Sequence, residues 1–212
     1  MWYGEFMEII GLKLGNVRSN AYVVSEGKEC FIIDPGFEGS AIIDYIKSRK
    51  LEPQFIYITH GHHDHIGGVR QLKDLYHIPV YAPLKDKIWM TDTVYNHWPY
   101  EIPVDQFVIE DDEIDFGKYV FRVIETPGHS EGSTSLYCAP YLFTGDTLFY
   151  ETIGRTDIPF SNQETLINSI KNKLFVLPNE TLVYPGHGKP STIGYEKENN
   201  PIVKPHIEEA HE

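Results

Sequence analysis

The sequence of 212 residues predicts an α/β protein, and three observations carry that prediction. Short apolar runs bounded by Gly, Pro and Asn occur along the chain, which is typical of β-strands. Segments with apolar residues at helical spacing separate several of these runs. Polar turns that carry His or Asp directly follow four of the apolar runs, which is where α/β sheets place their sites. We expect one domain over residues 1–212, because this length is short for two large domains.

The first third of the chain predicts paired strands followed by a helix. Residues 8–14, 21–25 and 29–33 have strand-like patterns, and glycine-containing turns separate them. Asp34-Pro35-Gly36 closes the third strand. Residues 40–50 then carry isoleucines at helical spacing, which indicates a helix.

The middle third contains the most apolar strand and the least regular segment. Residues 55–58 are wholly apolar, which predicts a central strand buried on both faces. We expect one helix over residues 64–76 and a further strand at 80–82. Residues 84–105 hold Trp89 and Trp98 in an irregular pattern. Two interpretations stay open for this segment, a packed surface loop and a substrate lid.

The last third predicts strands at residues 119–125, 134–138, 141–144 and 181–184. Ser161 and Glu164 have the spacing of a capping box, so we expect a helix to begin there. The chain after residue 199 is polar and acidic, and we expect this tail to be loosely held.

Composition excludes several classes of function. The formal net charge is −13 and no run of Lys and Arg occurs, which argues against a nucleic-acid partner. The N-terminal residues lack the pattern of a signal peptide, and no apolar stretch is long enough to cross a bilayer, so we expect no membrane partner. The two cysteines, Cys30 and Cys138, lie in apolar runs, which suits a reducing compartment. We therefore expect a cytoplasmic protein.

The densest group of candidate metal ligands follows the strand at residues 55–58. His60, His62, Asp64 and His65 lie within six residues of one another. Side chains two apart in a turning segment can point the same way, so His60 and His62 can share one ion. Asp64 and His65 enter the following helix and face elsewhere, so they can hold a second ion. For the remaining side chain, His63, we expect a ring that faces away from both, and the alternative is a group that orients a ligand.

Three later strands end in turns that each carry one further candidate ligand, namely His129, Asp146 and His187. Five histidines and two aspartates suit two divalent ions, for which zinc is our expectation and iron, or mixed zinc and iron, the alternative. We expect one ion on His60, His62 and His129 and the other on Asp64, His65 and His187, with Asp146 between them. Two such ions lower the pKa of a shared water to near neutrality, which predicts attack by hydroxide.

The stretch His60-Gly61-His62-His63-Asp64-His65 resembles the His-x-His-x-Asp-His signature of the metallo-β-lactamase superfamily. The later ligands follow in the order of that family, so the resemblance covers about residues 8–200. It implies a four-layer αββα sandwich. Within the superfamily, residues 143–149, 153–157 and 184–188 resemble the short, single-domain form of the glyoxalase II branch, the hydroxyacylglutathione hydrolases.

The glyoxalase II resemblance implies hydrolysis of a thioester, either an S-acylglutathione or a related acyl thiol. It implies catalytic roles for Asp64 and Asp146. A lysine and two tyrosines that hold the peptide in those enzymes correspond here to Arg155, Asp157 and Lys189. Arg155 and Lys189 are therefore candidates to bind a substrate carboxylate. The sequence lacks the two tyrosines at these positions. It also lacks a match to the C-terminal helical domain that helps to bind glutathione in full-length members.

Two other functions compete with thioester hydrolysis. The first is persulfide dioxygenation, for which this chain would hold one iron on His60, His129 and Asp146. The persulfide dioxygenases form a related branch that also carries the Gly-Arg-Thr-Asp stretch found here at residues 154–157. A non-catalytic binding module is disfavoured, because converging polar side chains cost stability when no metal satisfies them. Class B1 β-lactamases carry a cysteine at the position of Asp146. We expect a small-molecule substrate and a monomer or homodimer.

Overall fold

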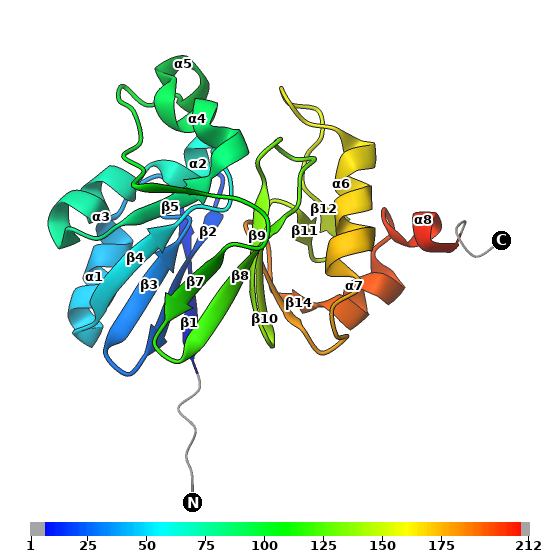
Figure 1. Ribbon diagram of the computed structural model, residues 1–212, viewed down its shortest axis with the longest axis horizontal. Helices are drawn as coiled ribbons and strands as arrows, with labels where there is room; N and C mark the ends of the chain where they lie inside the picture. The colour runs from blue at the N-terminus through cyan, green and yellow to red at the C-terminus, as the bar shows by residue number, and fades with distance from the viewer. Residues whose placement is uncertain (1–6, 209–212) are drawn as a thin grey trace, which may run out of the picture. The chain divides into compact units, whose positions relative to one another are not determined.

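A computed structural model describes residues 7–208 of the chain (Figure 1). The contacts divide them into two units, each with its own sheet. Unit 1 takes in the described residues up to Ala82 together with Lys87–Phe107, and unit 2 takes in Pro83–Asp86 and the described residues from Val108 onward. One domain over the whole chain stays a prediction. The signal-peptide prediction rests largely on residues 1–6, which lie outside the described part of the chain.

Unit 1 is built on a six-stranded sheet in the order β1-β2-β3-β4-β5-β6. β1, β2 and β3 pair in antiparallel fashion, whereas β3, β4 and β5 pair in parallel. The carboxyl ends of β3 and β4 therefore lie at the same edge of the sheet. The strands span Glu8–Leu14, Ser19–Glu26, Glu29–Ile33, Glu52–Tyr57, Val80–Pro83 and Gln106–Val108 in chain order.

Helices α1 (Ser40–Arg49) and α3 (Val69–Tyr76) lie against the sheet of unit 1 (Figure 1). Their apolar faces share one buried cluster with the strands, which explains why the isoleucines of α1 recur at helical spacing. The single helix expected over residues 64–76 is wrong. A short α2 (His63–Ile66) ends at Gly67, because the amide of Gly68 donates to the carbonyl oxygens of Pro35 and Gly36 at 2.7 and 2.6 Å.

The segment at residues 84–105 is more regular than the sequence indicates. It contains a 3-10 turn at Leu84–Asp86, α4 (Lys87–Thr91) and α5 (Thr93–Asn96). These helices span four or five residues each, which is too short for an apolar periodicity to show in the sequence. Trp89 and Met90 are buried, so this part of the segment packs against its unit.

Unit 2 is built on a second six-stranded sheet, in the order β14-β13-β10-β9-β8-β7. β8, β9 and β10 pair in antiparallel fashion, and β10 pairs in parallel with β13. β8, β10 and β13 consequently run in one direction and end at one edge. The strands of this sheet span Glu113–Phe116, Tyr119–Glu125, Thr134–Cys138, Tyr141–Gly145, Leu182–Pro185 and Ser191–Thr192, and a small hairpin is formed by β11 (Leu148–Phe149) and β12 (Thr152–Ile153).

Helix α6 (Gln163–Ser169) continues through a π-helical turn at Ile170–Leu174 and packs in the core of unit 2 with α7 (Ile193–Asn199) (Figure 1). The predicted capping box is wrong, because the side chain of Asn162 caps the helix by accepting from the amide of Thr165 at 2.8 Å. Ser161 instead donates to the carbonyl oxygen of Ile158 at 2.6 Å.

The loosely held tail is also wrong for the described residues after 199. Asn200 and Val203 have no exposed surface, and α8 (Lys204–Glu208) follows them. The side-chain amide of Asn200 donates to Glu196 and to the carbonyl oxygen of Thr152, at 3.0 and 3.1 Å. The side chain of Asn200 anchors this segment through these hydrogen bonds, which the polar composition of the tail does not reveal.

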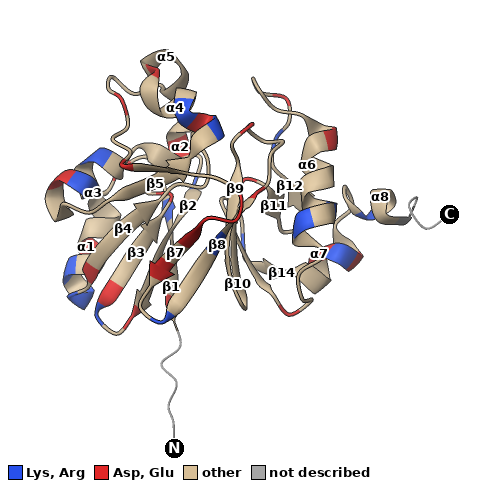
Figure 2. Ribbon diagram, in the orientation of Figure 1, with Lys and Arg blue, Asp and Glu red and all other residues tan. Residues whose placement is uncertain are grey.

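Charged residues of both signs occur on helices of each unit, as the mixed colours of α1, α3 and α7 show (Figure 2). Within residues 7–208, no helix combines the length and apolar character that a membrane span requires. Cys30 is buried, Cys138 is partly exposed, and both are free thiols. Burial raises the pKa of the Cys30 thiol to about 12.

Candidate metal centre

The first group of candidate ligands, His60, His62, Asp64 and His65, lies in unit 1 and is called the unit 1 ligand set. It follows the carboxyl end of β4, as the sequence predicts. The imidazole rings of His60 and His62 have centroids 4.8 Å apart, and those of His60 and His65 are 4.2 Å apart. His60 and His65 have no exposed surface, and Asp64 is 9% exposed. Three imidazoles and a carboxylate are thus gathered in one largely buried place.

Asp34, at the carboxyl end of the neighbouring strand β3, orients two of these rings. Its carboxylate accepts from the amide of Thr59 at 2.7 Å and from the hydroxyl of Thr59 at 2.6 Å. It also lies 3.0 Å from Nδ1 of His65, and because a carboxylate only accepts, Nδ1 of His65 carries the proton. The lone pair of the His65 ring is therefore on Nε2.

The same carboxylate sets the tautomer of His60 through Thr59. The hydroxyl of Thr59 gives its proton to Asp34 and lies 3.0 Å from Nδ1 of His60, so it accepts from that nitrogen. The lone pair of the His60 ring is again on Nε2. This is how carboxylates and hydroxyls prepare histidines for metal binding in other sites.

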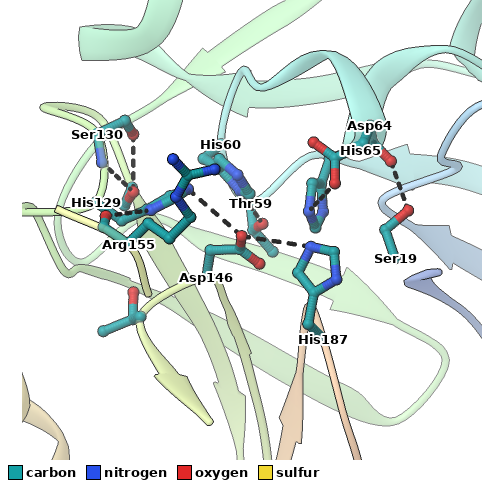
Figure 3. A network of polar contacts seen from close by, with 12 residues as sticks. Ser19, Thr59, His60, Asp64, His65, His129, Ser130, Asp146, Arg155 and His187 are labelled. Carbon is teal, nitrogen blue, oxygen red and sulfur yellow. Dashed lines mark hydrogen bonds and ion pairs between the residues drawn. The ribbon is translucent and has the colours of Figure 1, made fainter. Parts of the chain in front are cut away.

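The backbone of Asp64 is held by a hydrogen bond from the neighbouring part of unit 1. The hydroxyl of Ser19, on β2, donates to the carbonyl oxygen of Asp64 at 2.7 Å (Figure 3). Within the short α2, Oδ2 of Asp64 lies 3.5 Å from Nε2 of His65. The carboxylate of Asp64 and the lone pair of His65 therefore face the same small volume.

His62 and His63 point to different surroundings. The ring of His62 meets Trp89 edge to face, with centroids 4.7 Å apart. The ring of His63 instead meets Phe37 and His97, at 5.6 and 5.5 Å. Burial lowers the pKa of His63 below its ordinary value. Nδ1 of His63 nevertheless lies 3.9 Å from Oδ1 of Asp64, so this ring does not face away from every proposed ligand.

The second group, His129, Asp146 and His187, lies in unit 2 and is called the unit 2 ligand set. Each member follows one of the three strands that end at the same edge, namely β8, β10 and β13. The amide of Gly186 donates to the carbonyl oxygen of Gly145 at 2.7 Å, which joins the turns that precede His187 and Asp146. Residues far apart in sequence are thus adjacent because of the sheet topology.

Asp146 lies between the two histidines of its unit (Figure 3). Its Oδ2 is 3.4 Å from Nε2 of His129 and 3.5 Å from Nε2 of His187. Nδ1 of His129 lies 2.9 Å from the carbonyl oxygen of Arg155, which can only accept. Nδ1 therefore carries the proton, and the lone pair of His129 faces Asp146.

These spacings fit co-ligation better than hydrogen bonding. An N–H···O hydrogen bond is about 2.9 Å long, and the three nitrogen–oxygen distances within the two sets are 3.4, 3.5 and 3.5 Å. Two atoms bound at about 2.1 Å to one tetrahedral ion lie about 3.4 Å apart. Imidazole and carboxylate donors suit zinc and iron alike. Both sets therefore contain donor atoms whose chemistry and spacing suit ligands of divalent ions.

The two candidate substrate-binding residues lie in unit 2 and differ in their partners. Nε and Nη2 of Arg155 donate to the two carboxylate oxygens of Asp157, at 2.9 and 3.1 Å. This hydrogen bonding raises the pKa of Arg155 and lowers the pKa of Asp157. Nζ of Lys189 lies 3.5 Å from the centroid of the Tyr150 ring, a cation–π contact. Arg155 is thus already neutralised by a neighbour, whereas Lys189 rests on an aromatic face.

A cavity of about 630 Å³ lies in unit 2 beside the turn that carries His129. Pro127 and Gly128, the two residues before that histidine, form one wall. Phe160 belongs to another wall and is 44% exposed. The cavity is also lined by Lys85, Glu131, Ser161, Asn162 and Thr165.

From the sequence, no role in the site is assigned to Asp34 or to Thr59. Asp34 was interpreted as the turn that closes a strand. Its φ of +48° does place it in a turn, but its carboxylate points back toward Thr59 and His65. The available signal was an acidic residue at the carboxyl end of a strand parallel to β4, which is where side chains of neighbouring strands meet.

Comparison with known proteins gives the family. Residues 14–187 match the metallo-beta-lactamase superfamily. A probable metallo-hydrolase of Bacillus subtilis is 39% identical over 201 residues, which cover 91% of this chain and 95% of that protein. The hydroxyacylglutathione hydrolase GloC of Haemophilus influenzae is 34% identical over 186 residues, which cover 83% of this chain and 88% of that protein.

Solved structures agree with this match. The crystal structure of BLEG-1, a B3 metallo-β-lactamase, superimposes with a TM-score of 0.87 and 38% identity, over 92% of this chain and 99% of that one. The structure of TTHA1623 in a di-iron-bound form gives a TM-score of 0.78 and 35% identity, over 91% and 98%. The fold predicted from the sequence, that of the metallo-β-lactamases, is confirmed.

Proposed function

The chain belongs to the metallo-β-lactamase superfamily, and from that premise we propose that it is a metal-dependent hydrolase that cleaves a thioester. The observation that carries the proposal is the spacing of 3.4 to 3.5 Å between carboxylate oxygens and histidine Nε2 atoms in each ligand set. The thioester is favoured because a relative of the chain over 83% of its length is a hydroxyacylglutathione hydrolase.

We assign seven residues as ligands of two divalent ions, following the pattern in the sequence. One ion takes His60, His62 and His129, and the other takes Asp64, His65 and His187, with Asp146 shared. Zinc is our first assignment, and a relative in a di-iron-bound form makes iron a real alternative. Bound there, the ions supply Lewis acidity and make water nucleophilic at neutral pH.

The side chains divide the remaining work. His60, His65 and His129 carry their ring protons on Nδ1, so they offer neutral nitrogen donors. Asp64, in addition to its role as a ligand, orients the attacking water by accepting a hydrogen bond at its carboxylate. The oxygen of that water bonds to the acyl carbon and the carbon–sulfur bond breaks, so the products are a carboxylic acid and a thiol. No serine or cysteine nucleophile is required.

Lys189 is the stronger candidate for binding a carboxylate on the thiol arm of the substrate. Its ammonium group lies over the ring of Tyr150, which leaves its N–H groups on the outer side to face an anion. Nε and Nη2 of Arg155 already donate to Asp157, so a substrate carboxylate must compete with Asp157 for these donors. We therefore propose that Lys189 contributes more to substrate affinity than Arg155.

The test combines metal analysis with three substrates. Purified protein is analysed for metal identity and stoichiometry, and is then assayed with an S-acylglutathione, with a β-lactam and with glutathione persulfide. We expect two divalent ions per chain and steady release of free thiol that Asp146→Ala abolishes. Arg155→Met and Lys189→Met serve as a pair, and only Lys189→Met is expected to raise KM several-fold.

The other outcomes separate the competing functions. The β-lactam is included because a B3 metallo-β-lactamase is 38% identical to this chain. Turnover of the β-lactam without turnover of any thioester refutes the proposed substrate and keeps the metal site. One iron per chain with oxygen uptake on the persulfide establishes a dioxygenase on His60, His129 and Asp146. No metal after loading with zinc or iron overturns the metal site itself.

We further propose a small-molecule substrate, no nucleic-acid or membrane partner, and a monomer or homodimer in the cytoplasm. The formal net charge of −13 supports the exclusion of nucleic acid, because a polyanion is repelled at long range. Ultracentrifugation of the purified protein measures the oligomeric state directly.

A further inference from the structure

Asp86 is a buried carboxylate in unit 2 that the proposed chemistry does not use. It has no exposed surface and lies at the end of the 3-10 turn at Leu84–Asp86. Its Oδ2 accepts from the hydroxyl of Ser130 at 2.7 Å, and its Oδ1 accepts from the amide of Gly132 at 2.7 Å. Burying a carboxylate is costly unless hydrogen bonds compensate it. The hydrogen bonds that compensate the burial of Asp86 therefore indicate that this carboxylate has a structural role.

Both of these donors to Asp86 belong to the turn that carries His129. Within that turn, the amide of Ser130 donates to the hydroxyl of Ser133 at 3.1 Å, and the amide of Gly128 donates to the carbonyl oxygen of Ser130 at 2.9 Å. A methyl group on Gly132 would lie 2.3 Å from the backbone nitrogen of Asp86, so only glycine permits this close approach. The backbone on the carboxyl side of His129 is thereby bound to Asp86.

The ring of His129 is fixed independently by its hydrogen bond to the carbonyl oxygen of Arg155, at 2.9 Å. Asp86 fixes the backbone and Arg155 fixes the ring. Together they place Nε2 of His129 3.4 Å from Asp146. Loss of the contact with Asp86 releases the turn, so the imidazole must be ordered again each time it binds an ion.

Trp89 contacts a different ligand, within unit 1. Its ring lies edge to face against His62 at 4.7 Å and is 7% exposed. A methyl group on Gly61 would lie 2.2 Å from Cβ of Trp89, so the chain beside His62 is packed directly on this tryptophan. The indole therefore limits the rotation of the His62 ring.

We infer that Asp86 and Trp89 are positioning residues for His129 and His62, two of the three histidines that we propose as ligands of one ion. This inference rests on the proposed ligand set and goes beyond it. It also favours the packed interpretation over the lid at the start of the segment at residues 84–105. The start of that segment is a fixed support for metal ligands, because each of its two contacting side chains is buried against a ligand or its turn. A lid that opens at Asp86 or Trp89 is inconsistent with these contacts.

The experiment measures metal binding and needs no substrate. Asp86→Ala, Asp86→Asn, Trp89→Ala and Trp89→Phe are loaded with zinc and titrated with a chelator, and Co²⁺ absorption reports the coordination. We expect Asp86→Ala and Trp89→Ala each to weaken one of the two ions about 10- to 100-fold and to leave the other unchanged. Asp86→Asn and Trp89→Phe are expected to lose less, because Asn keeps the acceptor for Gly132 and Phe keeps an aromatic ring.

Glu196 provides a matched control in unit 2. It is also a carboxylate with no exposed surface, and it accepts from the hydroxyl of Ser191 at 2.5 Å and from the amide of Glu151 at 3.0 Å. It contacts a serine and a backbone amide as Asp86 does, but these lie at the start of β14 and in the β11–β12 hairpin and not in the turn that carries His129. We expect Glu196→Ala to lower the melting temperature as Asp86→Ala does and to bind both ions with the affinity of the parent.

The outcomes separate this inference from the proposed function. If the parent protein binds two ions and Asp86→Ala binds both with unchanged affinity, the inference is wrong and the proposed function stands. Equal weakening by Glu196→Ala shows that Asp86 acts only through general stability. If the parent binds no ion, the proposed function fails first. Should Asp86→Ala not fold, Ser130→Ala removes the hydroxyl that donates to Oδ2 of Asp86 and gives the same measurement.

Discussion

The two ligand sets differ in how the chain brings them together. The unit 1 ligand set occupies six consecutive residues after one strand, whereas the unit 2 ligand set comes from three turns between residues 129 and 187. The first is ordered by local geometry and by Asp34, and the second is ordered by the common direction of β8, β10 and β13. A short motif therefore needs one supporting carboxylate, while a dispersed set needs a whole sheet.

The largest expected effect tests whether the dispersed set provides the shared ligand. Asp146 lies at 3.4 and 3.5 Å from two proposed histidine ligands, whereas Asp64 lies at 3.5 Å from one proposed histidine ligand of its own unit, His65. We expect Asp146→Ala to weaken both ions and to lower thioester turnover by at least about 1,000-fold, since two cations lose a neutralising ligand. Asp64→Ala is expected to weaken one ion only. Elemental analysis after dialysis measures both, and equal loss in the two variants contradicts a shared role for Asp146.

The second prediction tests the support of the unit 1 ligand set. Asp34→Ala removes the acceptor for Thr59 and for Nδ1 of His65, so the rings of His60 and His65 lose their fixed tautomers. We expect zinc affinity to fall about 10- to 100-fold, as measured by competition with a chelator. Asp105→Ala is the control, because Asp105 accepts from the amide of Val80, also in unit 1, without contacting a ligand. A similar loss of affinity in the control refutes the specific role of Asp34.

The same contrast explains which parts of the molecule the sequence could predict. β1, β3, β8 and β9 have the predicted bounds, because alternation or continuous apolar character specifies a strand locally. The unit 1 cluster was visible for the same reason. The break of the helix at Gly67 depends on hydrogen bonds to Pro35 and Gly36, which are distant in sequence. Asp34 and Asp86 were missed because a buried acidic residue in a turn resembles an exposed one until its partners are known.

The third prediction concerns close packing beside the unit 2 ligand set. A methyl group on Gly154 would lie 1.8 Å from the carbonyl oxygen of Asp146, and one on Gly27 in unit 1 would meet nothing within 4 Å. We expect Gly154→Ala to lower the free energy of unfolding by about 1–3 kcal/mol and to weaken metal binding, because the turn at Asp146 must move. Gly27→Ala is expected to cost about 1–2 kcal/mol from its positive φ alone, with metal binding unchanged. Urea unfolding and chelator titration distinguish the two, and unaltered metal binding in Gly154→Ala contradicts the packing argument.

The last prediction, which leaves metal binding and activity near neutral pH unchanged, compares the thiols of the two units at alkaline pH. Burial raises the pKa of Cys30 in unit 1 from 9.0 to about 12. Above pH 9 the unfolded chain therefore loses this proton while the folded protein keeps it, so stability falls by up to about 1.4 kcal/mol per pH unit until the folded pKa is reached. Cys30→Ala removes that contribution, and we expect its unfolding free energy to decline less steeply than that of the parent between pH 9 and about 11. Cys138 is partly exposed, so Cys138→Ala is expected to retain most of the slope, and urea unfolding at several pH values measures all three. Equal slopes in the parent and in Cys30→Ala contradict the prediction. They would mean that the thiol ionises as readily in the folded protein as in the unfolded chain, contrary to its burial in the core of unit 1.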